Sequence, residues 1–183
     1  MTTIREASSP DDLVEVRQLM RAFIAWHRAR HRAESGLIDR YFDPVLFEAE
    51  LGALPGKFSR PTGRLLIAHD QDRAAGCVAL RDLGAGTCEM KRMFVYPDFH
   101  GKGIGRALAE AIIGHAKEIG YTRMRLDTGA RQIEAQTLYR SLGFRIVAPY
   151  YELPDDLRAW LVFMELDLTP GNGPKTNTEN DLN

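Results

Sequence analysis

Apolar residues recur at steps of three and four in four stretches of this chain, and that spacing predicts four amphipathic helices. The predicted helices cover residues 10 to at least 26, 43–54, 104–119 and 133–142. Local signals mark their ends, because Ser9 and Pro10 suit a helix start and Gly120 suits a helix C-cap. The long third helix has the clearest apolar face.

Short apolar runs bounded by turn residues predict strands between these helices. They cover residues 4–7, 64–69, 74–80, 87–95, 122–127, 144–147 and 160–168. The polar residues 70–73 form a hairpin turn, so the strands from 64 to 95 should be mostly antiparallel. The pattern therefore predicts an α/β (α+β) three-layer domain, with a mixed, mostly antiparallel sheet flanked by helices.

The chain has 183 residues, a length that suits one domain with a sizeable core. We assign this domain to residues 1–168. Residues 169–183 contain no aromatic residue and one aliphatic residue, which predicts a disordered tail.

Charge and cysteine usage exclude several function classes. A formal net charge of -1 argues against a nucleic-acid-coating protein and against a polybasic membrane surface. Cys77 and Cys88 lack metal-ligand spacing, so we interpret both as small buried hydrophobes in a reducing compartment and expect no metal. The N-terminus has no apolar stretch of signal length and no run is long enough to span a membrane, which predicts a cytoplasmic protein.

A basic run at residues 27–32 has two interpretations. It could bind phosphate, or it could be the solvated end of the first helix, where cations suit the helix dipole. We favour the second interpretation.

The most informative segment lies between the strand at 87–95 and the helix at 104–119. Gly101, Gly103 and Gly105 alternate there, and they remove Cβ atoms where a backbone must approach a ligand. Because a helix start also presents unpaired N–H groups and a positive dipole end, the segment suits a pyrophosphate. The predicted cofactor-binding residues of the loop are His100, Gly101, Lys102, Gly103, Ile104, Gly105 and Arg106. Lys102 and Arg106 are also explained as ordinary exposed cations.

A glycine pattern alone also fits a dinucleotide or nucleoside triphosphate loop. The first expects an early βαβ unit with an acidic residue about twenty positions onward, and the second ends in Gly-Lys-Ser/Thr. Neither condition is met, because Lys102 sits between glycines and the loop follows three predicted, mostly antiparallel strands.

Two segments together resemble the GNAT family of N-acetyltransferases. Residues 100–105 are similar to its pyrophosphate motif Gln/Arg-x-x-Gly-x-Gly/Ala, with His100 at a position where the family usually has glutamine or arginine. Residues 135–144 are similar to its A-x-x-L-Y-x-x-x-G-F signature. The resemblance extends from about Ile4 to Leu168. It implies acetyl-CoA as co-substrate, and among similar proteins pairing of sheet edges into a homodimer is common.

The resemblance also implies catalytic roles for two residues. Glu89 stands where similar enzymes place a carboxylate that deprotonates the amine, often through water, although a strand glutamate paired with Lys91 or Arg92 would look the same. Tyr139 matches a hydroxyl that protonates the departing thiolate, although it could simply pack. Backbone groups of Phe94 and Val95 would bond the pantetheine arm or the thioester oxygen, which requires their strand to splay from its neighbour.

The resulting hypothesis is an N-acetyltransferase acting on a small-molecule primary amine by direct attack. Alternatives are a protein or peptide N-acetyltransferase, a catalytically silent coenzyme A-binding regulatory module, and a nucleotide-binding protein. Asp127 is left outside the catalytic set, because an Asx turn or an N-cap explains it equally well. Similar proteins cover the acceptor cleft with the region containing Trp26, His27, His31 and Tyr41, although packing or exposure explains each of these residues alone.

Overall fold

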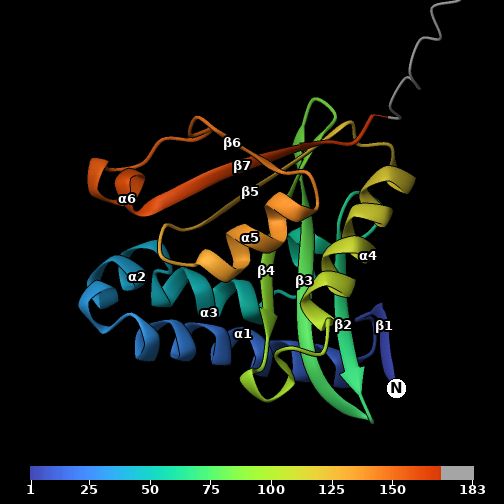
Figure 1. Cartoon of the computed structure of the whole chain (residues 1–183). Coiled ribbons are helices and arrows are strands. Elements are labelled where there is room, and N and C mark those ends of the chain that lie inside the picture. The colour runs from blue at the N-terminus through green and yellow to red at the C-terminus, as the bar shows by residue number, and fades with distance from the viewer. Residues whose placement is uncertain (170–183) are drawn as a thin grey trace, which may run out of the picture.

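The computed structural model describes residues 1–169, which form one seven-stranded sheet in the order β1-β2-β3-β4-β5-β7-β6 (Figure 1). The strands are β1 (Thr2–Glu6), β2 (Arg64–Asp70), β3 (Arg73–Gly84), β4 (Thr87–Val95), β5 (Arg123–Gly129), β6 (Arg145–Val147) and β7 (Leu161–Asp167). The pairs from β1 to β4 are antiparallel, β4 pairs with β5 in parallel, and β7 is antiparallel to both β5 and β6. The predicted mixed, mostly antiparallel sheet is therefore confirmed.

Six α-helices flank this sheet within the described residues. They are α1 (Pro10–Arg30), α2 (Ser35–Tyr41), α3 (Pro44–Gly52), α4 (Ile104–Ile119), α5 (Ile133–Ser141) and α6 (Asp155–Trp160). The sequence pattern did not predict α2 or α6, because seven and six residues are too few to display a helical period. The tail prediction for residues 169–183 lies outside the described residues except at Thr169.

Two apolar cores lie on opposite faces of the sheet. Alternation along β2 distributes its side chains between them, with Leu65 and Ile67 on one face and Leu66 and Ala68 on the other. The first face packs against α1, α2, α3 and α6, and the second packs against α4 and α5. This is a three-layer arrangement, and both free cysteines are buried as expected.

The sheet opens between β4 and β5. These strands pair at only three positions, from Thr87 with Arg123 to Glu89 with Arg125. Beyond Glu89 the strands diverge, and α5 lies over the opening (Figure 1). A bulge in β4 marks the divergence, because Arg92 has a φ of 56° and the register with β3 shifts there. The splay that the role of Phe94 and Val95 requires is thus present.

None of the helices within residues 1–169 is both long and apolar enough to cross a membrane.

Candidate active site

A cleft of about 420 Å³ follows the outer half of β4 to the start of α4. Its walls include the predicted residues Phe94, Val95, His100 and Ile104 and the three glycines of the loop. Gly101 and Gly103 have φ values of 79° and 78°, which other residues rarely adopt. A Cβ at either glycine would meet no protein atom within 4 Å, so the loop backbone borders open space.

The start of α4 is left without a side-chain cap. Gly103 occupies the N-cap position and no side chain accepts from the first turn of this helix. Unpaired N–H groups at a helix start need acceptors from elsewhere, and the positive end of the helix dipole favours an anion. The cleft therefore offers backbone donors to a phosphate.

Two of the predicted loop cations direct their side chains elsewhere. Lys102 Nζ lies 2.9 Å from Asp70 Oδ2, and Arg106 Nη2 lies 2.6 Å from Ser141 Oγ. Neither side chain lines the cleft. Residue 106 nevertheless belongs to the first turn of α4, so its backbone N–H is one of the unpaired donors.

His100, which departs from the family motif, contacts the end of β4. Its Nε2 atom lies 2.9 Å from the Val95 carbonyl oxygen, and its ring meets the Trp26 ring edge-on at 6.4 Å between centroids. The imidazole therefore ties the loop to the strand that precedes it and to α1.

A second, narrow cavity of about 60 Å³ continues from the cleft into the opening between β4 and β5. Phe23, Met93 and Gln132 line both spaces, so they adjoin. Tyr139 on α5 borders the narrow cavity and is 6% exposed. Burial raises the pKa of Tyr139 above its usual range, and its hydroxyl is therefore protonated at neutral pH.

Glu89 stands at the last paired position before the strands diverge and is 0% exposed. Arg81 Nε donates to its Oε2 at 2.5 Å, and the Tyr150 hydroxyl donates to its Oε1 at 2.8 Å. Lys91 Nζ lies 3.7 Å from the same Oε1. Among the two pairings considered from sequence, the one with Lys91 is present, whereas Arg92 pairs with Glu50.

Asp127 occupies a position that sequence reasoning misread. It lies within β5, two residues before the strand ends, so it is neither an N-cap nor a turn residue. Lys91 Nζ and the Tyr151 hydroxyl donate to its Oδ2 at 3.2 and 2.9 Å, and the Tyr41 hydroxyl donates to Oδ1. Asp127 also lines the narrow cavity together with Tyr139.

These contacts join into one charged network in the opening of the sheet. Burial alone would raise the pKa of Asp127, but the Lys91 charge and hydrogen bonds from Tyr41 and Tyr151 outweigh it and hold the pKa below its usual value. Burial and the two carboxylates raise the pKa of Tyr150 far above its usual range. The network thus keeps an ionised Asp127 beside protonated tyrosines.

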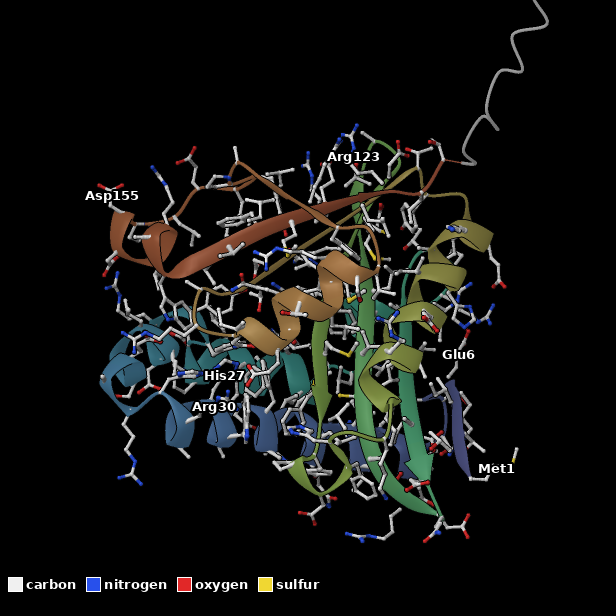
Figure 2. The ribbon with its side chains drawn as sticks, viewed as in Figure 1. Met1, Glu6, His27, Arg30, Arg123 and Asp155 are labelled. Carbon is white, nitrogen blue, oxygen red and sulfur yellow. The ribbon has the colours of Figure 1, made fainter. Side chains whose placement is uncertain are left out.

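The end of α1 closes the opening from below. Arg30 pairs with Glu134 of α5, and the His27 ring contacts Gln132, just before that helix (Figure 2). His27 is buried, which corrects the solvated interpretation of the basic run, whereas Arg28 and Arg30 are exposed as that interpretation requires. Burial lowers the pKa of His27 to about 4.

Sequence reasoning missed Arg81, Tyr150 and Tyr151 and set aside Asp127. Arg81 is one of many surface-type cations in the sequence, and the two tyrosines lie between β6 and α6 in a segment without a regular pattern. The adjacent Tyr150-Tyr151 pair before a short helix is the one signal that could have attracted attention.

Comparisons with known proteins agree with this geometry. The family model described as "Acetyltransferase (GNAT) family" matches residues 24–144. An uncharacterized N-acetyltransferase of Schizosaccharomyces pombe is 33% identical, and the match covers 91% of this chain and 95% of that protein. The IAA acetyltransferase of Azospirillum brasilense is 36% identical over 72% of this chain and 86% of its own length.

Solved structures give the same result. A Klebsiella pneumoniae protein described as an acyl-CoA N-acyltransferase has a TM-score of 0.68 and 26% identity, and the match covers 92% of this chain and 98% of that chain. A Bacillus subtilis acetyltransferase, solved in complex with CoA, has a TM-score of 0.50 and 26% identity, over 57% of this chain and 76% of that chain.

Proposed function

This chain belongs to the GNAT family of acetyltransferases and is an acyltransferase, and from that premise we propose that it transfers an acetyl group from acetyl-CoA to the primary amine of a small molecule. The observation that carries the proposal is the junction of two spaces. A cleft with uncapped backbone donors meets a narrow cavity that holds Tyr139 and Asp127, at the point where β4 leaves β5.

The residues of the cleft fit coenzyme A. The uncapped N–H groups of the loop and of α4 would hold the pyrophosphate, and the unpaired edge of β4 at Phe94 and Val95 would bond the pantetheine arm. The Bacillus subtilis acetyltransferase that was solved with CoA has the same fold, which supports this assignment. When bound, the thioester supplies the activated acyl group.

The acceptor must lose a proton before it can attack, because an alkyl amine is mostly an ammonium ion at neutral pH. We assign this step to Glu89, which takes up the proton through water. Its carboxylate is held by Arg81 and Tyr150 at the apex of the opening. Lys91 lies between Glu89 and Asp127, and its positive charge offsets the electrostatic repulsion between the two carboxylates.

Tyr139 supplies the proton that the departing thiolate needs, and the proton that the nitrogen loses as the amide forms restores the Tyr139 hydroxyl. Its hydroxyl is protonated at neutral pH and it borders the narrow cavity on the side of α5. A thiol has a pKa of about 8.5, so the thiolate is a moderate leaving group and gains from a nearby proton donor.

A small acceptor fits the enclosed geometry. The narrow cavity is about 60 Å³, and Tyr41 and Trp160 are among the side chains that line it. A peptide acceptor would need an open groove at this position. The relative from Azospirillum brasilense is named for a small-molecule substrate, which supports the same class of acceptor.

Replacement of each carboxylate tests the mechanism. Glu89→Gln keeps the shape of the side chain and removes the proton acceptor, so the rate of coenzyme A release with an accepted amine should fall about 10²- to 10⁴-fold. Calorimetry should find unchanged acetyl-CoA affinity, because Glu89 does not line the cofactor cleft. Glu118→Gln, on the exposed side of α4, is the matched control and should retain full turnover.

Asp127→Asn tests whether the second carboxylate of the network, which lines the narrow cavity, acts as the base in place of Glu89. If Asp127→Asn abolished turnover while Glu89→Gln kept it, Asp127 would be the base and the assignment of Glu89 would be wrong. If a broad amine panel released no coenzyme A although acetyl-CoA bound tightly, the proposed acetyl transfer to a small amine would itself be wrong.

A further inference from the structure

A third cavity, of about 270 Å³, lies on the far side of the charged network from the cofactor cleft. Five of its lining side chains are cationic and come from four separate elements. They are Arg40 of α2, Lys57 of a 3₁₀ turn at Gly56–Phe58, Arg81 of β3, and Lys91 and Arg92 of β4. Apart from two tyrosines and two leucines, these cations form the wall.

The carboxylates that pair with these cations stand behind the wall. Asp156 pairs with Arg40, Glu89 pairs with Arg81, and Asp127 pairs with Lys91. None of these carboxylates lines the cavity. The side chains that face the cavity are therefore cationic, although each of the five pairs with a carboxylate.

In one group of ion pairs the cations outnumber the carboxylates. Glu50 is the shared partner of both Lys57 and Arg92, so one carboxylate stands against two cations. Arg92 is held rigidly, because its guanidinium also lies over the Phe42 and Phe47 rings at 5.4 and 5.3 Å. Lys57 lines the cavity, is 43% exposed at its side chain, and has its ammonium 5.3 Å from the centre of the Phe58 ring. One positive charge is left without a balancing carboxylate, beside a space that can hold a small anion.

This cavity adjoins the narrow one. Tyr41, Lys91 and Arg92 line both spaces, and Asp127 and Tyr139 lie in the narrow one. Tyr41, Lys91 and Asp127 contact one another where the two spaces meet, so a small molecule bound across these side chains would have its amine toward Asp127 and Tyr139 and its other end among the cations. Arginine and lysine bind carboxylates through charge-assisted hydrogen bonds, whereas a neutral amide gains much less at such a site.

We propose that the acceptor is a small amine that also carries a carboxylate, and that Lys57 and Arg92 bind this carboxylate. The inference rests on the proposed function, because it names the substrate class of the same site. Lys57 lines this cavity and not the narrow one, so it controls the choice of acceptor without taking part in the chemistry.

Matched acceptors test the proposal. Glycine, β-alanine, γ-aminobutyrate, leucine and phenylalanine are each compared with their carboxamides, which keep the amine and lose the negative charge. The best acid should have a kcat/KM about tenfold or more above that of its amide, the size expected for a charge-assisted hydrogen bond. The series also varies the distance between the amine and the carboxylate, so the preferred member measures the gap between the two cavities.

A variant identifies the residue responsible. Lys57→Met should raise the KM for the acid about tenfold, leave kcat unchanged, and leave kcat/KM for the amide within about twofold. Lys117→Met, on the exposed face of α4, is the control and should change none of these values. Equal use of acid and amide by the unaltered protein would overturn the proposal, and so would an equal effect of Lys57→Met on both.

Two outcomes separate this inference from the proposed function. If neutral amines were acetylated and the acids had no advantage, the carboxylate site would be wrong and the acetyl transfer would stand. If no acceptor were acetylated, calorimetry with leucine and leucinamide in the presence of coenzyme A would still decide. Binding of leucine alone, lost in Lys57→Met, would support the site, and equal binding or no binding of both would overturn it.

Discussion

The cofactor cleft and the charged network lie at the two ends of one opening in the sheet. The cleft is formed mainly by backbone groups, whereas the network is formed by side chains. The cleft uses backbone N–H groups of one continuous segment, from β4 through the glycine loop to α4. The network uses side chains from α2, β3, β4, β5 and the segment before α6.

This difference has an energetic consequence. Backbone donors at a helix start remain in place when a neighbouring side chain changes, so the cleft should tolerate most substitutions outside its glycines. Buried charges depend on one another, because removing one partner leaves the other desolvated and unpaired. The network should therefore respond strongly to single changes, and the cleft weakly.

The largest effect is expected at Lys91, the cation between Glu89 and Asp127. Lys91→Met leaves two buried carboxylates without a cation between them, and the free energy of unfolding should fall by about 3–5 kcal/mol. Urea denaturation measures the change, with the exposed Lys117→Met as control. A loss below about 1 kcal/mol would mean that the network is not energetically coupled.

A pH dependence is expected at His27, which borders the narrow cavity between the two regions. Its pKa of about 4 in the folded protein lies below the value of 6.5 expected for an unfolded chain. Between pH 6.5 and about 4 the His27 ring is protonated in the unfolded chain but neutral in the folded protein. The free energy of unfolding is therefore highest above pH 6.5 and falls as the pH is lowered to about 4.

The loss should amount to about 3 kcal/mol. Unfolding free energies from pH 7 to pH 4 measure it, and His27→Gln should flatten this part of the profile relative to the unaltered protein. A control variant, Lys117→Met on the exposed face of α4, should keep the profile. Identical slopes in the unaltered protein and in His27→Gln would show that His27 does not titrate in this way.

Tyr139 joins the two regions, because it borders the narrow cavity from the cofactor side. Tyr139→Phe keeps the packing and removes the hydroxyl, so kcat should fall about 10²-fold while acetyl-CoA affinity is retained. Tyr121→Phe is the matched control, since Tyr121 is also buried but its hydroxyl donates to the Thr62 carbonyl oxygen. If Tyr139→Phe and Tyr121→Phe had the same turnover, Tyr139 would have only a packing role.

The smallest effect is expected in the glycine loop. Gly103 has a φ of 78°, so Gly103→Ala strains the loop by about 1–2 kcal/mol and should weaken acetyl-CoA binding about tenfold. Gly114→Ala lies inside α4 with no atom within 4 Å of the added Cβ, and it should leave affinity unchanged. Equal affinities of the two variants, measured by calorimetry, would mean that the loop backbone does not hold the cofactor.

Much of the fold was accessible from local patterns. The boundaries of β4 and the helix at 104–119 with its Gly120 cap agree with the prediction, because period, cap and turn residues lie together in short stretches. The short helices α2 and α6 could not be found in this way. Both are stabilised by tertiary packing, as Ile38 and Leu157 in the same apolar core indicate.

Some residues of the candidate site could likewise be predicted from local patterns, and others could not. Glu89 and Tyr139 were predicted because each belongs to a segment with a recognisable pattern around it. Arg81 and Tyr150, which hold the Glu89 carboxylate, come from positions 8 and 61 residues away in the chain. Arg81 lies opposite Glu89 in the β3–β4 hairpin but falls just outside the strand predicted at 74–80, and no local pattern relates Tyr150 to Glu89. The cationic wall at Lys57 and Arg92 was not predicted from the sequence either.

The sequence by itself determined the antiparallel arrangement of the strands between residues 64 and 95, the order of strand, glycine loop and helix, and the resemblance to the family, because each depends on residues that lie close together in the chain. Only the tertiary structure decided which charges meet. The divergence of β4 from β5 leaves a space that α1, α2, α5 and the segment before α6 close, and their side chains become partners only there. Burial then raises the pKa of Tyr139 and lowers that of His27. At Asp127 the Lys91 charge and the hydrogen bonds from Tyr41 and Tyr151 outweigh burial, and no single segment contains these surroundings.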